Sequence, residues 1–370
     1  MHPKTRIHAD PSLEMDQFDH LPDSLLLLIL NKVADIRSLG RCGAVSKRFN
    51  SLVPLVHDIY IKIDRVVTVD GSDPDETPNI PSPRPRNMFT NFLKMVLYVI
   101  KPFHHIRSNT SGSRGPLFPQ LSSQHSPAQV LKNFTHVRNL HIVLPSGDVG
   151  TEDGVLLKWR AEFGCTLQNC VILGGTRVDK KTSISSTQEN LNLNSNLNLN
   201  LNSMQEDNGT MPESFYTNGG LKLRVVWTIS SLIAASTRHY LLRQIIKDHP
   251  TLVSLVLTDA DAQGTLIMGS KQLKEVRENQ LACSASSNRT QVPACNMKLR
   301  YAPYLELPGG VGLQGATLVA IRPSCEGSGS GNGSKKETDS FILGAFDGVF
   351  KTAVKALMKR RSYLLEMNGF

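Results

Sequence analysis

The stretch that decides the fold of the N-terminal region is FDHLPDSLLLLILNKVADIRSLGRCGAVSKRFNSLV, residues 18–53. Pro22 stands where a proline helps an α-helix to begin, and the residues from there to Val33 predict a strong helix. The apolar run from Leu25 to Leu30 surrounds the whole circumference of that helix. A helix that is apolar all round must be covered on every side, so this helix is predicted to be buried by something.

Two shorter helices are predicted to follow the first. Asp35 is a predicted N-cap for a helix through Ala44, and Ser46 is a predicted N-cap for the next. In that last helix we expect Phe49 to face inward and Arg48 to face water. Three helices in so short a stretch bury little surface among themselves, and domains this small usually need a disulfide, a metal or a partner. We therefore expect a partner protein to cover the surplus leucine surface.

This pattern resembles the F-box family. Its members carry a Leu-Pro pair before the first helix, apolar residues at helical spacing, and a closing Val-Ser-Lys-Arg-aromatic turn. The sequence departs from the family at Leu26 to Leu28, where members often alternate in polarity, and at Ala34, which replaces a common leucine. The residues that the resemblance implies for partner binding are Leu21, Pro22, Leu25, Ile29, Leu30, Leu39, Val45 and Phe49.

The resemblance implies a function without catalysis by this chain. F-box helices dock on the Skp adaptor, which connects to a cullin scaffold and a RING subunit. The chain is then expected to be the substrate-recognition subunit of this ubiquitin ligase, with an unknown protein substrate and with nuclear and cytoplasmic localisation. Residues 224–264 also resemble a plant group of F-box proteins with a weakly leucine-rich C-terminal region, the auxin-up-regulated subgroup being the nearest that can be named.

Three alternatives stay open at this point. The helices could be part of one larger core formed by the rest of the chain. An F-box protein can also act outside a cullin complex, as a binding or transcription-associated protein. Finally, Gly310-x-Gly312-x-x-Gly315 matches a dinucleotide-binding pattern, but a strand is predicted after it where a nucleotide site needs a helix, so a turn is the preferred interpretation.

Composition and charge narrow the classes of function that remain. The chain has 370 residues and a formal net charge of +9, yet no stripe of aromatic residues interleaved with Lys and Arg, so nucleic-acid binding is not indicated. Its six cysteines form no CxxC pair and lie beside no histidine cluster, which predicts reduced thiols and no zinc site. We expect no cofactor, no secretion signal and no membrane-spanning segment.

The predicted architecture is a small three-helix module followed by an α/β domain with disordered insertions, an α+β or α/β class overall. The predicted parts are a disordered lead (1–17), the F-box (18–55), a proline-rich linker (70–86), a substrate-recognition domain (130–324), a second linker (325–340) and a C-terminal helix (341–361). Within the domain, residues 178–220 are predicted to be a low-complexity insertion, because Asn and Leu alternate at its centre.

Stretches of the domain share the apolar frame of a leucine-rich repeat strand. Three stretches match well, namely Val137-x-x-Leu140-x-Ile142, Leu167-x-x-Cys170-x-Ile172 and Leu252-x-x-Leu255-x-Leu257. A fourth stretch, which begins at Leu313, matches more loosely. Their irregular spacing leaves generic strands of an α/β domain as an equal alternative. In either case helices are expected to pack on one curved or open parallel sheet.

Two longer helices are predicted in the C-terminal half. The first runs from Arg224 to His249, is ended by Pro250, and has Val226, Ile229 and Ile233 on one face, followed by Leu241 and Ile245. The second spans residues 341–361, and its inward residues are expected to be Phe346, Val349, Phe350, Ala353 and Leu357.

Overall fold

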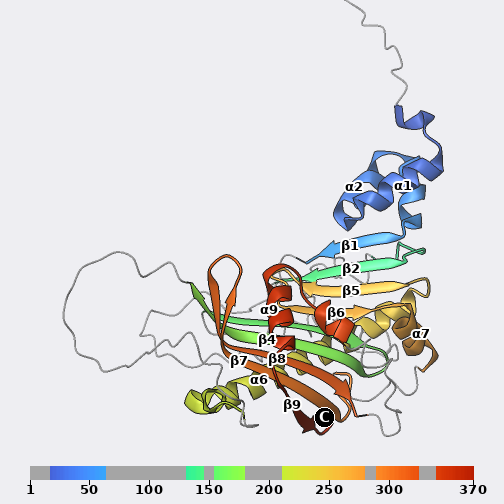
Figure 1. Ribbon diagram of the computed structural model, residues 1–370. Coiled ribbons are helices and arrows are strands. Elements are labelled where there is room, and N and C mark those ends of the chain that lie inside the picture. The colour runs from blue at the N-terminus through green and yellow to red at the C-terminus, as the bar shows by residue number, and fades with distance from the viewer. Residues whose placement is uncertain (1–16, 64–130, 146–153, 180–210, 280–288, 325–338) are drawn as a thin grey trace, which may run out of the picture.

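The computed structural model describes residues 17–63, 131–145, 154–179, 211–279, 289–324 and 339–370. Within these ranges, short N-terminal helices precede a nine-stranded mixed sheet, as Figure 1 shows. The predicted class, a helical module followed by a region of strands and helices, is confirmed as mixed α+β. Most of the predicted lead (1–16), the linker at 70–86, most of the insertion (180–210) and most of the second linker (325–338) lie outside the described residues.

The helical module forms where the sequence predicts it. Its elements are η1 (Gln17–His20), α1 (Asp23–Val33), α2 (Ile36–Val45), α3 (Lys47–Leu52) and η2 (Val53–Leu55). Both predicted N-caps are confirmed, because the Asp35 carboxylate accepts from the Ser38 backbone N–H at 2.9 Å and the Ser46 hydroxyl accepts from the Phe49 N–H at 3.1 Å. These bonds satisfy donors that the first turn of a helix leaves free.

The sheet is partly parallel and partly antiparallel. Its spatial order is β1-β2-β5-β6-β3-β4-β8-β7-β9. The strands are β1 (Asp58–Lys62), β2 (Asn139–Leu144), β3 (Val155–Phe163), β4 (Leu167–Asp179), β5 (Ser254–Asp259), β6 (Gly264–Met268), β7 (Cys295–Leu307), β8 (Val311–Pro323) and β9 (Ser362–Met367). Only β1–β2, β2–β5 and β3–β6 pair in parallel, so the expectation of a parallel sheet is wrong. The long hairpin of β7 and β8 and the short connection between β3 and β4 impose antiparallel pairing on the other half.

Two of the predicted repeat-like stretches are neighbours in space. Leu140 of β2 pairs with Leu255 of β5, and Ile142 pairs with Leu257. The first strand extends this register, because Ile59 pairs with Leu140. The stretches at Leu167–Ile172 and Leu313–Leu318 instead lie on β4 and β8, which pair antiparallel with each other. The leucine-rich-repeat interpretation therefore does not hold for those two stretches.

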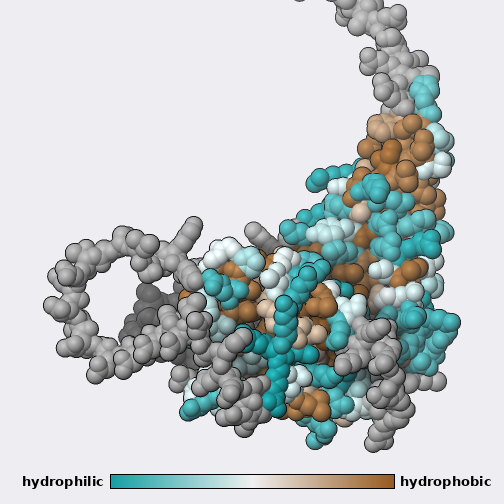
Figure 2. Space-filling model, in the orientation of Figure 1, coloured by the Kyte–Doolittle hydropathy of each residue, from teal (hydrophilic) through white to brown (hydrophobic). Residues whose placement is uncertain are grey.

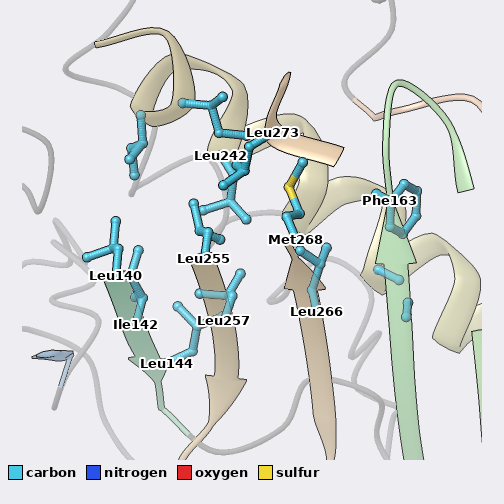
Figure 3. Packing of buried hydrophobic residues seen from close by; sticks show 14 of the residues in the cluster. Leu140, Ile142, Leu144, Phe163, Leu242, Leu255, Leu257, Leu266, Met268 and Leu273 are labelled. Carbon is cyan, nitrogen blue, oxygen red and sulfur yellow. The ribbon is translucent and has the colours of Figure 1, made fainter. Parts of the chain in front are cut away.

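Apolar side chains lie on both faces of the sheet. Neighbouring residues of β4 belong to different clusters, Cys170 and Ile172 to one and Val171 and Leu173 to the other, because successive side chains of a strand point to opposite faces. Helices α6 (Gly220–Asp248) and α7 (Ser270–Glu278) cover the first face, and α9 (Gly348–Met358) covers the second. Figure 3 shows the first cluster, where leucines of β2, β5 and β6 point toward Leu242 of α6 and Leu273 of α7.

Helix α6 confirms the predicted helix but only part of its predicted apolar face, since Ile245 is buried and Leu241 packs against the core. Val226 is exposed, and Ile229 and Ile233 are only half-buried. The buried side includes Trp227 and Leu232 together with polar residues. A reading of the apolar pattern alone missed this side, because polar side chains that find partners can replace apolar ones in a core.

One of these buried polar groups is the guanidinium of Arg238. It forms a 2.5 Å ion pair with Asp259 at the end of β5, and both side chains are almost fully buried. The second oxygen of Asp259 accepts the backbone N–H of Gly264 at 2.6 Å, and the guanidinium lies 4.7 Å from the ring of Trp159. The pair therefore links α6 to β5, β6 and β3 inside the core.

The C-terminal region differs from the single predicted helix. A helical turn at residues 339–343 ends at Gly344, α9 begins only at Gly348, and residues from Ser362 onward form β9. Ala353 and Leu357 face inward as predicted, whereas Val349 is exposed. Gly348 has a φ of +58°, a conformation that favours glycine and separates the two helical pieces.

Among the described cysteines, Cys165 departs from the expectation of reduced thiols. Cys42, Cys170 and Cys295 are free thiols, but Cys165 is disulfide-bonded. Burial raises the pKa of the Cys295 thiol to about 11, so this thiol stays protonated at neutral pH.

Candidate partner-docking site

Helix α1 presents an apolar face that the described residues do not cover. Leu25, Leu28, Ile29 and Val33 are between 37% and 58% exposed. Spacings of three residues (Leu25 to Leu28) and four residues (Leu25 to Ile29 and Ile29 to Val33) place them along one side of the helix, and Leu26 and Leu30 turn toward the core. We call these four exposed residues the α1 face. Figure 2 shows the corresponding hydrophobic surface over the helical module.

The two ends of the predicted motif are held together by Arg48. Its Nε donates to the Asp23 carboxylate at 2.8 Å, and its other nitrogens donate to the backbone carbonyls of Phe18 (2.9 Å) and Leu21. The rings of Phe18 and Phe49 also meet edge to face, with centroids 5.8 Å apart. The expectation that Arg48 faces water holds only in part, because its side chain is 30% exposed and makes these bonds. Its side chain fixes the turn before α1 against α3 and so sets how α1 begins.

The predicted partner-binding residues divide into three groups. Pro22, Leu25, Ile29 and Val45 are exposed, and Val45 is 72% exposed at the end of α2. Leu21 and Phe49 are half-buried against the core. Leu30 and Leu39 are 1% and 0% exposed.

The prediction that Leu30 and Leu39 bind a partner directly is corrected by their burial. Both pack in the main hydrophobic cluster, where they support the surface from behind. Leu28 and Val33 belong to the α1 face but were missed as site residues. Their helical spacing from Leu25 and Ile29 was the available signal.

The module is joined firmly to the sheet. The Asn31 side-chain oxygen accepts the backbone N–H groups of His57 (2.7 Å) and Asp58 (3.2 Å) at the start of β1. The Tyr60 N–H donates to the Ala34 carbonyl at 2.9 Å, and Asp35 forms a bridge with Tyr60. The α1 face therefore has a fixed orientation relative to the sheet, although the module keeps this face outside the shared core.

No second chemical site emerges in the described residues. The predicted turn in the Gly310–Gly315 stretch is confirmed, because Gly309 and Gly310 have positive φ between β7 and β8 and the residues after them continue as strand β8. No three His, Cys, Asp or Glu residues within the described ranges are grouped so that they could hold a metal ion. None of the helices in those ranges is both long and apolar enough to span a membrane.

Comparison with known proteins places this geometry in a family. The F-box-like family model matches residues 18–62, which span the helical module and β1. No solved structure matches the chain.

Relatives match over nearly the whole length. F-box protein At5g46170 of Arabidopsis thaliana is 49% identical, with 100% of this chain and 98% of the relative covered. F-box proteins AUF1 and AUF2 of the same plant are 36% and 37% identical, with 96% of this chain and 100% of each relative covered. The predicted family resemblance is thereby confirmed, and the chain belongs to the F-box protein family.

Proposed function

We propose that the chain is the substrate-recognition subunit of a Skp–cullin–F-box ubiquitin ligase and that the α1 face docks on the Skp adaptor. The observation that carries this proposal is the exposure of Leu25, Leu28, Ile29 and Val33 on one side of a helix whose other side is buried. Contiguous apolar surface of this kind marks sites of protein interaction. Covering a half-exposed leucine contributes about 1 kcal/mol, so a few such residues supply a substantial part of a binding energy.

The rest of the geometry suits a presenting role. The helical module lies at the β1 end of the sheet, and the remainder of the sheet extends away from it (Figure 1). F-box proteins generally act as non-catalytic adaptors. In the proposed complex, this chain raises the local concentration of a bound protein near the ubiquitin-conjugating enzyme, which the RING subunit holds. We further propose that the complex acts in the nucleus and the cytoplasm.

Co-purification tests the proposal. The full chain, expressed with a Skp adaptor and a cullin, should retain both proteins. Leu25→Asp with Ile29→Asp should remove both, because carboxylates on the α1 face lose their hydration in the interface. Leu221→Asp is the matched control, since Leu221 is 43% exposed on α6 and Leu25 is 45% exposed. Undiminished retention of the adaptor by the double variant contradicts docking through the α1 face.

The second candidate is an F-box protein that works outside a cullin complex. The family match is compatible with it, because the F-box-like region covers only residues 18–62. The same experiment separates the two functions. Retention of the adaptor without the cullin, under conditions where a known F-box protein retains both, favours the second candidate.

A further inference from the structure

The two edge strands of the sheet, β1 and β9, differ in what lies beside them. At one edge, β1 is capped by the helical module, since Tyr60 pairs with the backbone of Ala34 and Asp35. At the other edge, β9 pairs with β7 and with no further strand among the described residues. In an edge strand, every second residue directs its N–H and C=O groups away from the sheet, where another strand can pair with them.

Strand β9 lacks the features that normally keep an edge from pairing. Its sequence, SYLLEM, contains no Lys and no Pro, and Glu366 is its one charged residue. Leu364 is 65% exposed and Leu365 is 39% exposed, so apolar side chains are accessible on both faces of the strand. Natural sheets usually protect such edges with charges, prolines or bulges. Within the described part of the chain, this apolar edge is therefore suited to pairing with a further chain segment.

Charges near β9 indicate what kind of segment fits. Lys359, Arg360 and Arg361 are exposed and directly precede the strand. Lys298 is exposed on β7 and lies opposite Leu364. A strand that adds antiparallel, as β9 itself adds to β7, places its C-terminal end beside Arg361. Carboxylates at that end of an incoming segment are attracted by the basic residues.

We propose that β9 binds an extended peptide segment of a partner protein by strand addition, antiparallel, with acidic residues at the C-terminal end of that segment. Main-chain hydrogen bonds supply the common part of the affinity in this mode, and the side chains and flanking charges supply the selectivity. β1 and β9 are the first and last strands in the sheet order, so roughly 40 Å of sheet separates the bound segment from the helical module. That the segment belongs to a ubiquitination substrate rests on the proposed function.

The test uses the full chain and a fluorescent peptide of about ten residues, in which Val and Thr alternate before a glutamate-rich C-terminal end. Two further peptides carry N-methyl groups on one or the other alternate set of residues. In an added strand, only one alternate set of residues donates its backbone N–H groups to the neighbouring strand. One methylated peptide should therefore lose more than about tenfold in affinity, while the other binds within about threefold of the parent peptide. Fluorescence polarisation measures all three.

Charge reversal gives a second readout on the protein side. Lys359→Glu, Arg360→Glu and Arg361→Glu together should weaken the parent peptide by about tenfold. Lys351→Glu with Lys355→Glu is the control, because both residues are exposed on α9 and outside the proposed site. A peptide with its glutamates at the N-terminal end should also bind more weakly than the parent.

Four results overturn the proposal. The first is the absence of saturable binding of the parent peptide up to about 1 mM. The second is equal behaviour of the two N-methylated peptides. The third is an affinity that the control reversal lowers as much as the reversal at residues 359–361. The fourth is a dimer of the chain that Leu364→Asp dissociates, since a second copy then occupies the edge.

The peptide test and the adaptor test fail independently. Leu25→Asp with Ile29→Asp should lose the adaptor and keep the peptide, whereas the reversal at residues 359–361 should do the opposite. A wild-type chain that binds the peptide but no adaptor removes the substrate interpretation and leaves the strand-addition site in place.

Discussion

The helical module and the sheet each contain an arginine–aspartate pair, and the two pairs differ in solvent exposure. Arg48 and Asp23 lie 2.6 Å apart with side chains 30% and 64% exposed, whereas Arg238 and Asp259 lie 2.5 Å apart at 1% and 0%. Leucines follow the same contrast, because the module exposes Leu25 while the strands β2, β5 and β8 bury their leucines. The two faces of the sheet are thus covered by helices of its own chain, and the module leaves one face for another molecule.

The largest expected effect is on the buried ion pair. Asp259→Ala leaves the Arg238 charge buried without its partner and should lower the free energy of unfolding by about 3–5 kcal/mol. Asp23→Ala removes the exposed counterpart and should cost less than about 1 kcal/mol. Urea denaturation of the two variants measures both changes. Similar losses in the two variants would show that exposure does not separate the two pairs.

Two leucines of α1 give the next comparison. Leu30→Ala should lower the free energy of unfolding by about 2–5 kcal/mol, because it opens a cavity in the main cluster. Leu25→Ala should change it by about 0.5 kcal/mol or less, since Leu25 is 45% exposed. In samples that remain folded, Leu25→Ala should lower the affinity for the adaptor more than Leu30→Ala does. If Leu25→Ala lost more stability than Leu30→Ala, the core would lie against the Leu25 side of α1, which would contradict this account.

A smaller effect comes from a buried histidine of α6. His239 stacks on Phe163 with ring centroids 4.7 Å apart, and its Nδ1 lies 2.6 Å from the Thr290 hydroxyl. Burial, with a contribution from the charge of Arg243, lowers the pKa of His239 to about 3. Below pH 6.5 the unfolded chain then binds a proton that the folded chain excludes. Acidification should therefore lower the free energy of unfolding, by about 2 kcal/mol between pH 6.5 and 5 from this residue.

A pair of variants isolates that contribution. His239→Gln should reduce the dependence of stability on pH over this range, whatever it does to stability at pH 7. His20→Gln serves as the control, because His20 is exposed in the helical module. An unchanged pH dependence in His239→Gln would show that the histidine becomes charged in the folded chain.

The sequence predicted the helical module well because its signals are local. Asp35 and Ser46 cap the helices that follow them, and Pro22 precedes α1, as their positions indicate. The surplus of leucine also predicted an incompletely covered helix. What it did not reveal was which leucines face outward, because Leu25 and Leu30 are alike until α2, α3 and β1 cover one side of the helix. The role of Arg48 depends on contacts with residues at least 25 positions away, which local reasoning does not detect.

The sheet was harder to predict because its pairing is not local. Leu140 and Leu255 share a frame and meet in parallel register, yet Cys170 has the same frame in an antiparallel strand. The pattern of a strand states which side chains share a face and not which strand is its neighbour. Strand β9 was missed because the helical pattern before it was extended through residue 361, past the end of α9 at Met358.

The most direct test is a calorimetric titration of a Skp adaptor into the full chain and into the Leu25→Asp, Ile29→Asp variant at several temperatures. If the outward side of α1 is the docking surface, the wild-type chain binds with a negative heat-capacity change, which accompanies burial of apolar area. The double variant then loses at least about a hundredfold in affinity, while its unfolding midpoint in urea stays near that of the wild type. An adaptor that binds both chains with equal affinity contradicts the account.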